Sequence, residues 1–216
     1  DKLLMYMLVS TIVGARLGHC LFYEPEYYFS NPIKFLYVWE GGLASHGGAI
    51  GILIGLYIYA KKVNKPYIWI LDRIVVPVAI GGAFIRFGNL MNSEIYGHET
   101  TLPWGFIFAL NGETLPKHPT QLYEALCYLT TGIVLFSIYK FALPKIREGL
   151  LLGIFFIGIF LSRFFIEFVK ENQVGFEEGM VLNMGQLLSI PFIIMGICLI
   201  VRSFMAKTPM ALRNGK

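Results

Sequence analysis

Long apolar segments recur along the whole chain at the length that a helix needs to cross a lipid bilayer. A transmembrane helix contains about 20 predominantly apolar residues, and segments of this kind lie near residues 3–23, 45–60, 68–91, 120–140, 149–168 and 184–203. Only 15% of the residues are charged, whereas about a quarter of a soluble domain is charged. The sequence therefore predicts an all-α polytopic membrane protein, a bundle of about six transmembrane helices in a single integral membrane domain, residues 1–216.

Charged residues are divided unequally between the connections. Basic residues follow the second and fourth segments and occur in the tail: Lys61, Lys62, Lys65, Lys140, Lys145, Arg147, Arg202, Lys207, Arg213 and Lys216. The alternate connections carry Glu24, Glu26, Glu40, Glu94, Glu99, Glu113, Glu171, Glu177 and Glu178. Lysine and arginine mark the cytoplasmic side of a membrane protein. We therefore expect the acidic connections to face outward and both ends of the chain to lie in the cytoplasm.

Two further features refine this expectation. The outward connection of residues 93–119 is long and partly apolar, which predicts a small extracytoplasmic head. Gly47, Gly51 and Gly55 recur at every fourth position of the second segment, a spacing that allows helices to approach closely. The formal net charge of +4 is not concentrated in one patch, so binding of nucleic acid is not expected.

Polar side chains gather at the outward ends of the apolar segments. They are Arg16, His19, His46, Arg86, Asn89, His118, Gln121, Glu124, Arg163 and Glu167. Charges inside a membrane helix are costly, so such groups usually face the interior of the bundle and one another. Several cationic groups at one depth indicate a site for an anionic ligand, and the abundant anions at that depth are phospholipid headgroups.

Helical spacing sharpens the prediction. Arg86, Asn89, Ser93 and Tyr96 would lie on one stripe if the third helix continued through them, and this stripe would line a cavity open to the outer leaflet. Arg163 and Glu167 are four residues apart and can form an ion pair on one helix face.

Each of these residues also has a structural interpretation. The Arg86 side chain could extend to the membrane interface, and Arg163 with Glu167 could hold helices together. His46 could be a capping or packing residue, and His118 a loop residue. At this point a lipid enzyme, a lipid carrier and an ion pathway all remain open.

Sequence motifs for other chemistries are absent. The sequence contains neither H-E-x-x-H nor G-x-S-x-G, so a zinc protease and a serine nucleophile are unsupported. Cys20, Cys127 and Cys198 lie within apolar segments without metal-ligand spacing and are interpreted as small buried hydrophobic residues.

Six short stretches, in order along nearly the whole chain, resemble the bacterial prolipoprotein diacylglyceryl transferases. They are "GARLGHCLFY" (14–23), "WEGGLASHGGAIG" (39–51), "IRFGNLMNSEIYG" (85–97), "HPTQLYEA" (118–125), "SRFFIEF" (162–168) and "NMGQLLSIP" (183–191). The third is similar to the family signature G-R-x-G-N-F-x-N-G-E-x-x-G, with Ile85, Leu90 and Ser93 as departures. Family members usually have one more membrane helix before the first of these stretches.

The resemblance implies a reaction and its partners. The family transfers the sn-1,2-diacylglyceryl group of phosphatidylglycerol to the lipobox cysteine in the signal peptide of a prolipoprotein. A thioether forms and glycerol 1-phosphate leaves, in the first step of lipoprotein maturation at the bacterial cytoplasmic (inner) membrane, with the active site facing the outer leaflet. The nucleophilic cysteine belongs to the substrate, so no cysteine of this chain is required. The resemblance also implies no metal and no cofactor.

The same resemblance implies roles for the polar residues. We expect Arg86 to hold the phosphate, Arg163 oriented by Glu167 to share its charge, and His46 to act as the base, although an arginine-centred hydrogen-bond network could replace it. The expected residues of the phosphatidylglycerol site are Arg86, Asn89, Asn92, Glu94, Tyr96, Gly97 and Arg163. The expected supporting residues are Arg16, His118, Gln121, Tyr123 and Glu124.

Two other functions remain in competition. A non-catalytic flippase or carrier for anionic lipid could use the same polar cavity, but it should also need polar groups toward the cytoplasmic half, where only Asp72 and Arg73 stand out. A purely structural membrane subunit is disfavoured, because it would bury these charges without a functional reason.

Overall fold

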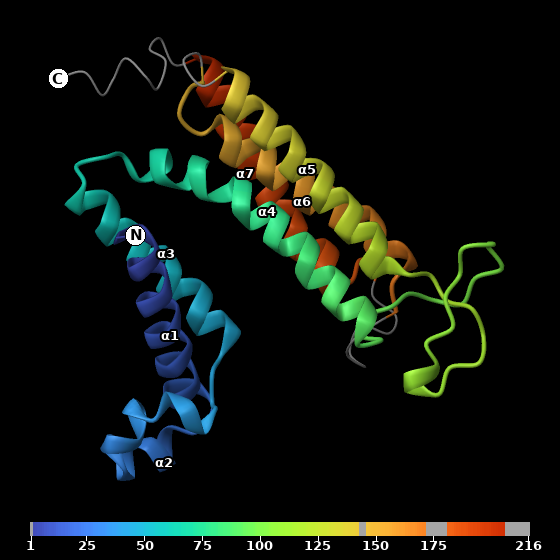
Figure 1. Cartoon of the computed structure of the whole chain (residues 1–216), viewed down its shortest axis with the longest axis horizontal. Coiled ribbons are helices and arrows are strands. Elements are labelled where there is room, and N and C mark those ends of the chain that lie inside the picture. Colours follow the sequence, from blue (N-terminus) through green and yellow to red (C-terminus); the bar gives the residue numbers. More distant parts are fainter. Residues whose placement is uncertain (1, 143–145, 172–180, 206–216) are drawn as a thin grey trace. The chain divides into compact units, whose positions relative to one another are not determined.

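The computed structural model describes residues 2–142, 146–171 and 181–205, and regular structure in these ranges is helical (Figure 1). The long helices are α1 (Lys2–Phe22), α3 (Ser45–Lys62), α4 (Tyr67–Met91), α5 (Thr120–Ala142), α6 (Leu150–Ile166) and α7 (Met184–Met205). The shorter ones are α2 (Pro25–Ser30), η1 (Pro32–Leu36), η2 (Val38–Glu40), η3 (Ala109–Asn111) and η5 (Glu167–Val169). The six predicted segments are all helices, which confirms the all-α prediction. Lys145, Glu177, Glu178, Lys207, Arg213 and Lys216 lie outside the described residues.

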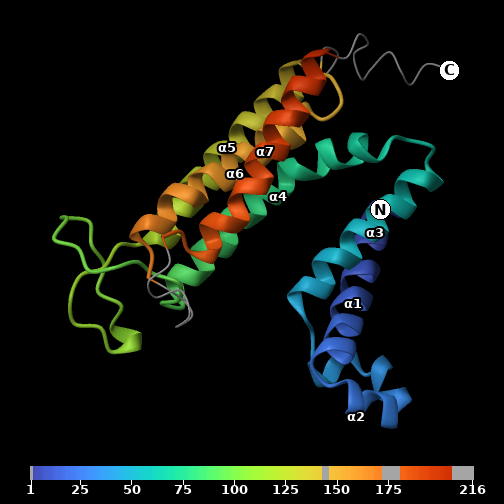
Figure 2. The same cartoon turned by 180° about the vertical axis from the view of Figure 1, so that it is seen from behind.

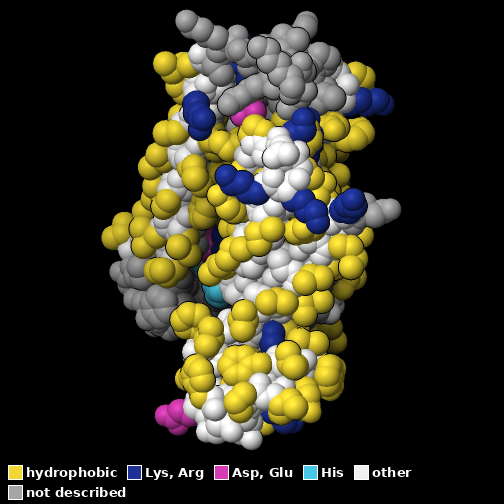
Figure 3. Space-filling model, turned by 90° about the vertical axis from the view of Figure 1, so that its left-hand side faces the viewer, with side chains coloured by type: hydrophobic (Ala, Val, Ile, Leu, Met, Phe, Trp, Pro, Cys, Tyr) yellow, Lys and Arg dark blue, Asp and Glu magenta, His cyan; other side chains and the backbone are white. Residues whose placement is uncertain are grey.

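Within the described part of the chain, five helices are long and apolar enough to span a membrane: α1, α4, α5, α6 continued into η5, and α7. Helix α3 has the predicted position but falls outside this group, because His46, Lys61 and Lys62 dilute its apolar residues. Many large hydrophobic side chains of the long helices are exposed, and they cover much of the face drawn in Figure 3. This surface suits a polytopic membrane protein, whose helices present apolar side chains to lipid.

The chain divides into two compact units, Asp1–Ile70 and Leu71–Lys216, and each is described by itself. In the first unit, α1 lies beside α3 in both views of the ribbon (Figures 1 and 2). The two helices approach each other closely at their glycines, and the rings of Tyr6 and Tyr59 also meet between them. A Cβ atom added at Gly51 would collide with the main-chain oxygen of Ser10, and one at Gly47 with that of Gly14. The predicted close approach at the spaced glycines is confirmed.

In the second unit, α5, α6 and α7 lie side by side (Figures 1 and 2). Val75, Val76 and Ala79 of α4 pack with Leu135 of α5 and Leu151 of α6 in a buried core. Asp72, also on α4, is completely buried. Its carboxylate accepts hydrogen bonds from the main-chain N–H groups of Gly149 (2.7 Å) and Leu152 (2.8 Å). Because the first N–H groups of a helix lack partners within it, Asp72 caps the beginning of α6.

Helix α4 ends at Met91 because the chain turns sharply at the next residues. Ser93 and Ile95 have the left-handed φ values of +56° and +61°, which a continuing right-handed helix excludes. The segment that follows forms short antiparallel contacts, pairing Gly97 with Lys170, Glu99 with Lys117 and Phe106 with Lys117. The predicted head segment is thus attached, through Gly97, to Lys170, the residue that follows η5.

Candidate functional site

A cluster of buried charges lies where α4 ends and α5 begins. Nε of Arg86 is 2.7 Å from Oε2 of Glu124, and the Glu124 side chain is completely buried. This contact is an ion pair rather than a well-aligned hydrogen bond, since Oε2 has no partner in hydrogen-bond geometry. Removing one partner of a buried ion pair is strongly destabilising, because it leaves the other charge uncompensated. Glu124 therefore fixes the position of Arg86, the arginine of the signature.

The end of α6 and η5 contribute the other members of the cluster. Nζ of Lys170 lies 3.3 Å from Oε1 of Glu124 and 3.5 Å from Oε2 of Glu167, and only 3% of Lys170 is exposed. The same Oε2 of Glu167 lies 3.9 Å from Nε of Arg163, which confirms the predicted pairing of Arg163 with Glu167. Lys170 thus connects the Arg86–Glu124 pair to the Arg163–Glu167 pair.

The charges in this cluster do not cancel. Arg86, Lys170 and Arg163 are cations, while Glu124 and Glu167 are the two anions, so one positive charge is in excess. Arg163 is the most accessible member, with 33% of its side chain exposed. Its terminal nitrogens donate no hydrogen bond to another described residue. The cluster can therefore accept an anion at Arg163 without breaking an existing pair.

The first turn of α7 also contacts the cluster. A Cβ atom added at Gly185 would lie 2.5 Å from the carboxylate of Glu167, so this glycine lets the carboxylate reach the beginning of the helix, where negative charge is favoured. The turn is closed by a reciprocal cap: the N–H of Gln186 donates to Oδ1 of Asn183 (2.9 Å), and the N–H of Asn183 donates to Oε1 of Gln186 (3.0 Å).

The residues after α4 form the edge of the cluster. Arg86 donates to Oδ1 of Asn89 (3.2 Å), and the Asn89 amide donates to Oε2 of Glu94 (3.0 Å). The buried Gln121 amide donates to the main-chain oxygen of Glu94 (2.6 Å) and leaves its own Oε1 without a partner among the described residues. Asn92 is exposed, and its side chain forms no hydrogen bond within the described ranges.

The predicted polar stripe of four residues is wrong beyond its first two members. Arg86 and Asn89 lie on one helix face, as expected. Ser93 and Tyr96 do not continue it, because the left-handed turn at Ser93 ends the helical spacing. Tyr96 instead donates to Oε1 of Glu113 (2.9 Å) and stacks on Phe108, so it belongs to the packing of the head segment.

A second ion cluster lies in that segment. Nζ of Lys117 is 2.8 Å from Glu113 and 2.5 Å from Glu171, and it also lies over the Tyr96 ring. Burial alone would lower the pKa of Lys117, but the hydrogen bonds to Glu113 and Glu171 outweigh it and raise this pKa. Hydrogen bonds from Lys117 and Tyr96 lower the pKa of Glu113. This second ion cluster connects the head segment to Glu171, the residue that follows Lys170.

His118 and Tyr123 form a separate contact. Nδ1 of His118 is 3.1 Å from the Tyr123 hydroxyl, which also accepts a hydrogen bond from the Trp104 indole (2.9 Å). These residues support the junction between the head segment and α5. The structure does not bring them into the ion pairs around Glu124.

In the first unit, Arg16 binds the connection between α1 and α3. Its guanidinium donates to the main-chain oxygens of Lys34 (2.6 Å), Phe35 (3.2 Å), Gly41 (2.5 Å) and Gly42 (3.2 Å). It also lies 5.0 Å from the ring centre of Tyr28, and only 3% of it is exposed. Arg16 therefore holds the connection between α1 and α3. Its predicted role in supporting the phosphatidylglycerol site stays a prediction.

The two histidines of the first unit differ. His19 stacks on Tyr23, and its Nε2 lies 4.0 Å from Glu24. His46 is exposed at the beginning of α3, and its imidazole forms no hydrogen bond or ion pair with a described residue. Its predicted role as a base stays a prediction.

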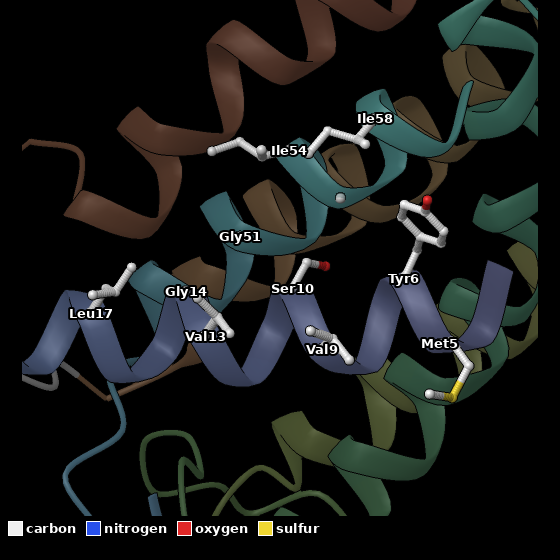
Figure 4. A pocket seen from close by; sticks show the side chains of 11 residues that line it. Met5, Tyr6, Val9, Ser10, Val13, Gly14, Leu17, Gly51, Ile54 and Ile58 are labelled. Atoms are coloured by element: carbon white, nitrogen blue, oxygen red, sulfur yellow. The ribbon is translucent and has the colours of Figure 1, made fainter. Parts of the chain in front are cut away.

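An apolar groove of about 560 Å³ runs between α1 and α3 (Figure 4). Met5, Val9, Val13, Leu17, Ile54 and Ile58 line it together with glycines, Tyr6 and Ser10. Its lining carries no carboxylate, guanidinium or amine, so it lacks the chemistry of an anion site.

Lys170 and Lys117 are absent from the predicted residues. The sequence did contain a signal for Lys170, which lies three residues after Glu167 and can reach the same face of a helical turn. Lys117 carried no comparable signal, because its partners Glu113 and Glu171 meet only in the folded chain. All three cysteines are free, but only Cys20 is buried; Cys198 is exposed on α7. Within the described ranges, no three His, Cys, Asp or Glu side chains are grouped to hold a metal ion.

A family model described as "Prolipoprotein diacylglyceryl transferase" matches residues 1–202. The chain belongs to this family. A phosphatidylglycerol–prolipoprotein diacylglyceryl transferase of Porphyromonas gingivalis is 51% identical over 94% of this chain and 77% of its own length. Proteins with the same name from Tolumonas auensis (45% identical) and Chloroherpeton thalassium (46% identical) also match 94% of this chain and cover 78% and 76% of their own lengths.

Proposed function

We propose that this chain transfers the sn-1,2-diacylglyceryl group of phosphatidylglycerol to the lipobox cysteine of a prolipoprotein. Membership of the family supports the reaction class, and the names of the relatives support the two substrates. The observation that carries the proposal is the charge cluster around Glu124, which holds Arg86 and Arg163 together with one positive charge in excess.

The reaction requires such a charge. The sulfur of the substrate cysteine attacks a glyceryl carbon, a carbon–sulfur bond forms, and the bond from that carbon to the phosphate oxygen breaks. The electron pair leaves with the phosphate, so a phosphodiester with one negative charge becomes glycerol 1-phosphate with two. The thiol proton passes to a base. Fixed cations lower the barrier by stabilising the charge that grows on the departing group.

The contacts of the two arginines support different roles for them in binding the phosphate. Arg86 is held by Glu124 and Asn89 and is only 15% exposed, so it presents a fixed cation at the back of the site. Arg163 is more exposed and its terminal nitrogens can form a planar pair of hydrogen bonds to phosphate oxygens. Asn89, Asn92 and Glu94 are available for the glycerol hydroxyls of the headgroup.

The base is a separate part of the proposal. His46 has the side chain best suited to take the thiol proton near neutral pH, and it belongs to the first unit, whereas both arginines belong to the second. Replacement of His46 by glutamine should remove the base and keep a hydrogen-bonding side chain of similar length. Transfer that persists in His46→Gln would assign deprotonation to another group.

The location of the site is proposed from the charge pattern. Both substrates reside in the membrane, so phosphatidylglycerol enters from the outer leaflet and the signal peptide arrives laterally. For the carrier alternative, Asp72 no longer counts as a polar group that could line a transport path, because its buried carboxylate caps α6.

The test is mass spectrometry of a lipobox peptide incubated with the purified protein in phosphatidylglycerol vesicles. We expect the peptide to gain one diacylglyceryl group on its cysteine, and to gain none when phosphatidylethanolamine is the only lipid. A peptide with serine in place of the cysteine is the matched control. Binding of anionic lipid without any mass gain would favour the carrier.

A further inference from the structure

The buried amine of Lys170 has no assigned role, although it contacts both carboxylates of the charge cluster. It lies between Glu124 of α5 and Glu167 of η5, at 3.3 Å and 3.5 Å. Each of these carboxylates is also the partner of an arginine. Lys170 is the one cation that connects the two arginine–glutamate pairs within the described residues, and it is too deeply buried to meet a lipid headgroup directly.

The backbone of Lys170 is held in place by the signature segment. Gly97 pairs with Lys170 in an antiparallel bridge, the N–H of His98 donates to the oxygen of Val169 (2.9 Å), and the N–H of Glu171 donates to the oxygen of Tyr96 (3.3 Å). A Cβ atom added at Gly97 would collide with the oxygen of Val169. The absence of a side chain at Gly97 therefore allows the contact that places Lys170.

We propose that Lys170 is a positioning residue, held through Gly97, that keeps Glu124 and Glu167 in place and supplies the excess positive charge which Arg86 and Arg163 present to the phosphate. This inference rests on the proposed function. It also gives Gly97 a role in main-chain packing rather than in contact with phosphatidylglycerol.

The charge balance explains why a neutral residue cannot replace Lys170. Without its amine, the two arginines face two glutamates and the cluster is neutral. The attraction for an anion then falls in proportion to the charge of the anion. The effect should therefore be larger for glycerol 1-phosphate, which carries nearly two charges at pH 7.5, than for phosphatidylglycerol, which carries one.

The experiment compares the binding of these two ligands by titration calorimetry on the full chain in detergent, with short-chain phosphatidylglycerol as the lipid. For Lys170→Met we expect affinity to fall about ten-fold for glycerol 1-phosphate and about three-fold for phosphatidylglycerol. Lys170→Arg keeps the charge and should restore both affinities to within about two-fold of the original protein. A purely structural role would lower both affinities equally and would not depend on charge.

Two further variants keep the test decisive. Gly97→Ala should reproduce the selective loss of Lys170→Met, because it displaces the segment that places the lysine. Lys117→Met is the matched control, since Lys117 is also buried between two carboxylates but contacts neither arginine; the ratio of the two affinities should not change. If Lys170→Met does not fold, Lys170→Gln and Gly97→Ala provide the same comparison.

The outcomes separate this inference from the proposed function. If the original protein transfers the diacylglyceryl group and the ratio of the two affinities is the same in Lys170→Met as in the original protein, the role of Lys170 is wrong and the function stands. Equal loss of both affinities in Lys170→Arg and Lys170→Met would also overturn it. If the original protein transfers nothing, the function fails whatever the binding ratio shows.

Discussion

Arg16 in the first unit and Arg163 in the second occupy similar places in the sequence pattern but very different surroundings. Arg16 is almost completely buried, and four main-chain oxygens and an aromatic ring surround its guanidinium. Arg163 is one third exposed and has a single carboxylate neighbour at 3.9 Å. Both arginines lie near the end of a long apolar helix, yet only one of them retains donors for a ligand.

The difference shows what an arginine near the end of a membrane helix can do. Each of the three guanidinium nitrogens of Arg16 donates to an uncharged main-chain oxygen, so this cation holds a loop. In the second unit, carboxylates orient the cations, and the addition of Lys170 gives an excess of positive charge. The partners of an arginine, rather than its depth, therefore distinguish a structural role from a chemical one.

The largest effect should come from Arg86→Ala, which removes the best-fixed cation. We expect transfer to the lipobox peptide to fall about 10³-fold, the upper range for the loss of one preorganised group that stabilises developing charge. Arg86→Lys keeps the positive charge but lacks the planar guanidinium, so its transfer rate should lie between those of Arg86→Ala and the original protein. Rates are measured by mass spectrometry at matched concentrations of folded protein. Equal rates for Arg86→Ala and the original protein would remove Arg86 from the site.

Arg16→Ala should lower the stability of the protein more than its transfer rate, the reverse of what we expect for Arg86→Ala. It leaves the main-chain oxygens of Lys34 and Gly41 without their charged donor, and hydrogen bonds of this kind contribute about 1.5–3 kcal/mol each. We expect a loss of about 3 kcal/mol in the free energy of unfolding, with transfer per folded molecule reduced less than ten-fold. If the Arg16→Ala protein were stable but inactive, Arg16 would contribute to the reaction rather than to the structure of its loop.

Gly51→Ala tests whether the first unit depends on close packing between its helices. The added methyl group would collide with the main-chain oxygen of Ser10, so α1 and α3 must separate at a cost of about 2 kcal/mol. Gly81 is the control, because an added Cβ there has no neighbour within 4 Å. Thermal unfolding in detergent should show a lower midpoint for Gly51→Ala and little change for Gly81→Ala.

The head segment of the second unit should be stable only between acid and alkaline limits. The pKa of Glu113 is lowered from 4.5, so its contribution is present above pH 4.5 and is lost as the pH falls through the lowered value. The pKa of Lys117 is raised from 10.5, so its contribution is present below pH 10.5 and is lost as the pH rises through the raised value. Proteolysis of residues 97–118 should accelerate outside this window. Lys117→Met should abolish the alkaline transition and weaken the acid one, because Tyr96 still donates a hydrogen bond to Glu113.

The smallest effect should come from Ser93→Gly. Ser93 has a φ of +56°, a conformation in which glycine avoids the strain of a side chain. The gain is offset by the greater freedom of glycine in the unfolded chain, so we expect a stabilisation of about 0.5 kcal/mol without loss of transfer. A destabilisation larger than that would show that the Ser93 side chain contributes to packing.

The helices could be predicted from the sequence because their signals are local. Apolar segments predicted α1, α4, α5, α6 and α7 to within a few residues. The glycine spacing predicted that a helix packs closely on α3, but it did not identify α1 as that helix. The end of α4 was also predicted, but the stripe through Ser93 and Tyr96 was not compatible with it. A left-handed turn depends on only a few residues, and helical periodicity does not reveal it.

The site could be predicted only in part. The pairing of Arg163 with Glu167 follows from a spacing of four residues, and it is present. The contact of Arg86 with Glu124 joins two helices, and the position of Lys170 depends on a bridge to Gly97. Such contacts between distant residues arise from packing, so residue type and spacing indicated their chemistry but not their partners.

The most direct test of the account is the rate of diacylglyceryl transfer by Arg163→Ala, measured by mass spectrometry of the lipobox peptide and corrected for folded protein by thermal unfolding. Because Arg163 is partly exposed and weakly paired, the variant should unfold at nearly the original temperature. We expect a loss of transfer of about 100-fold. Transfer at the original rate by a fully folded Arg163→Ala protein would contradict the assignment of the phosphate site to this cluster.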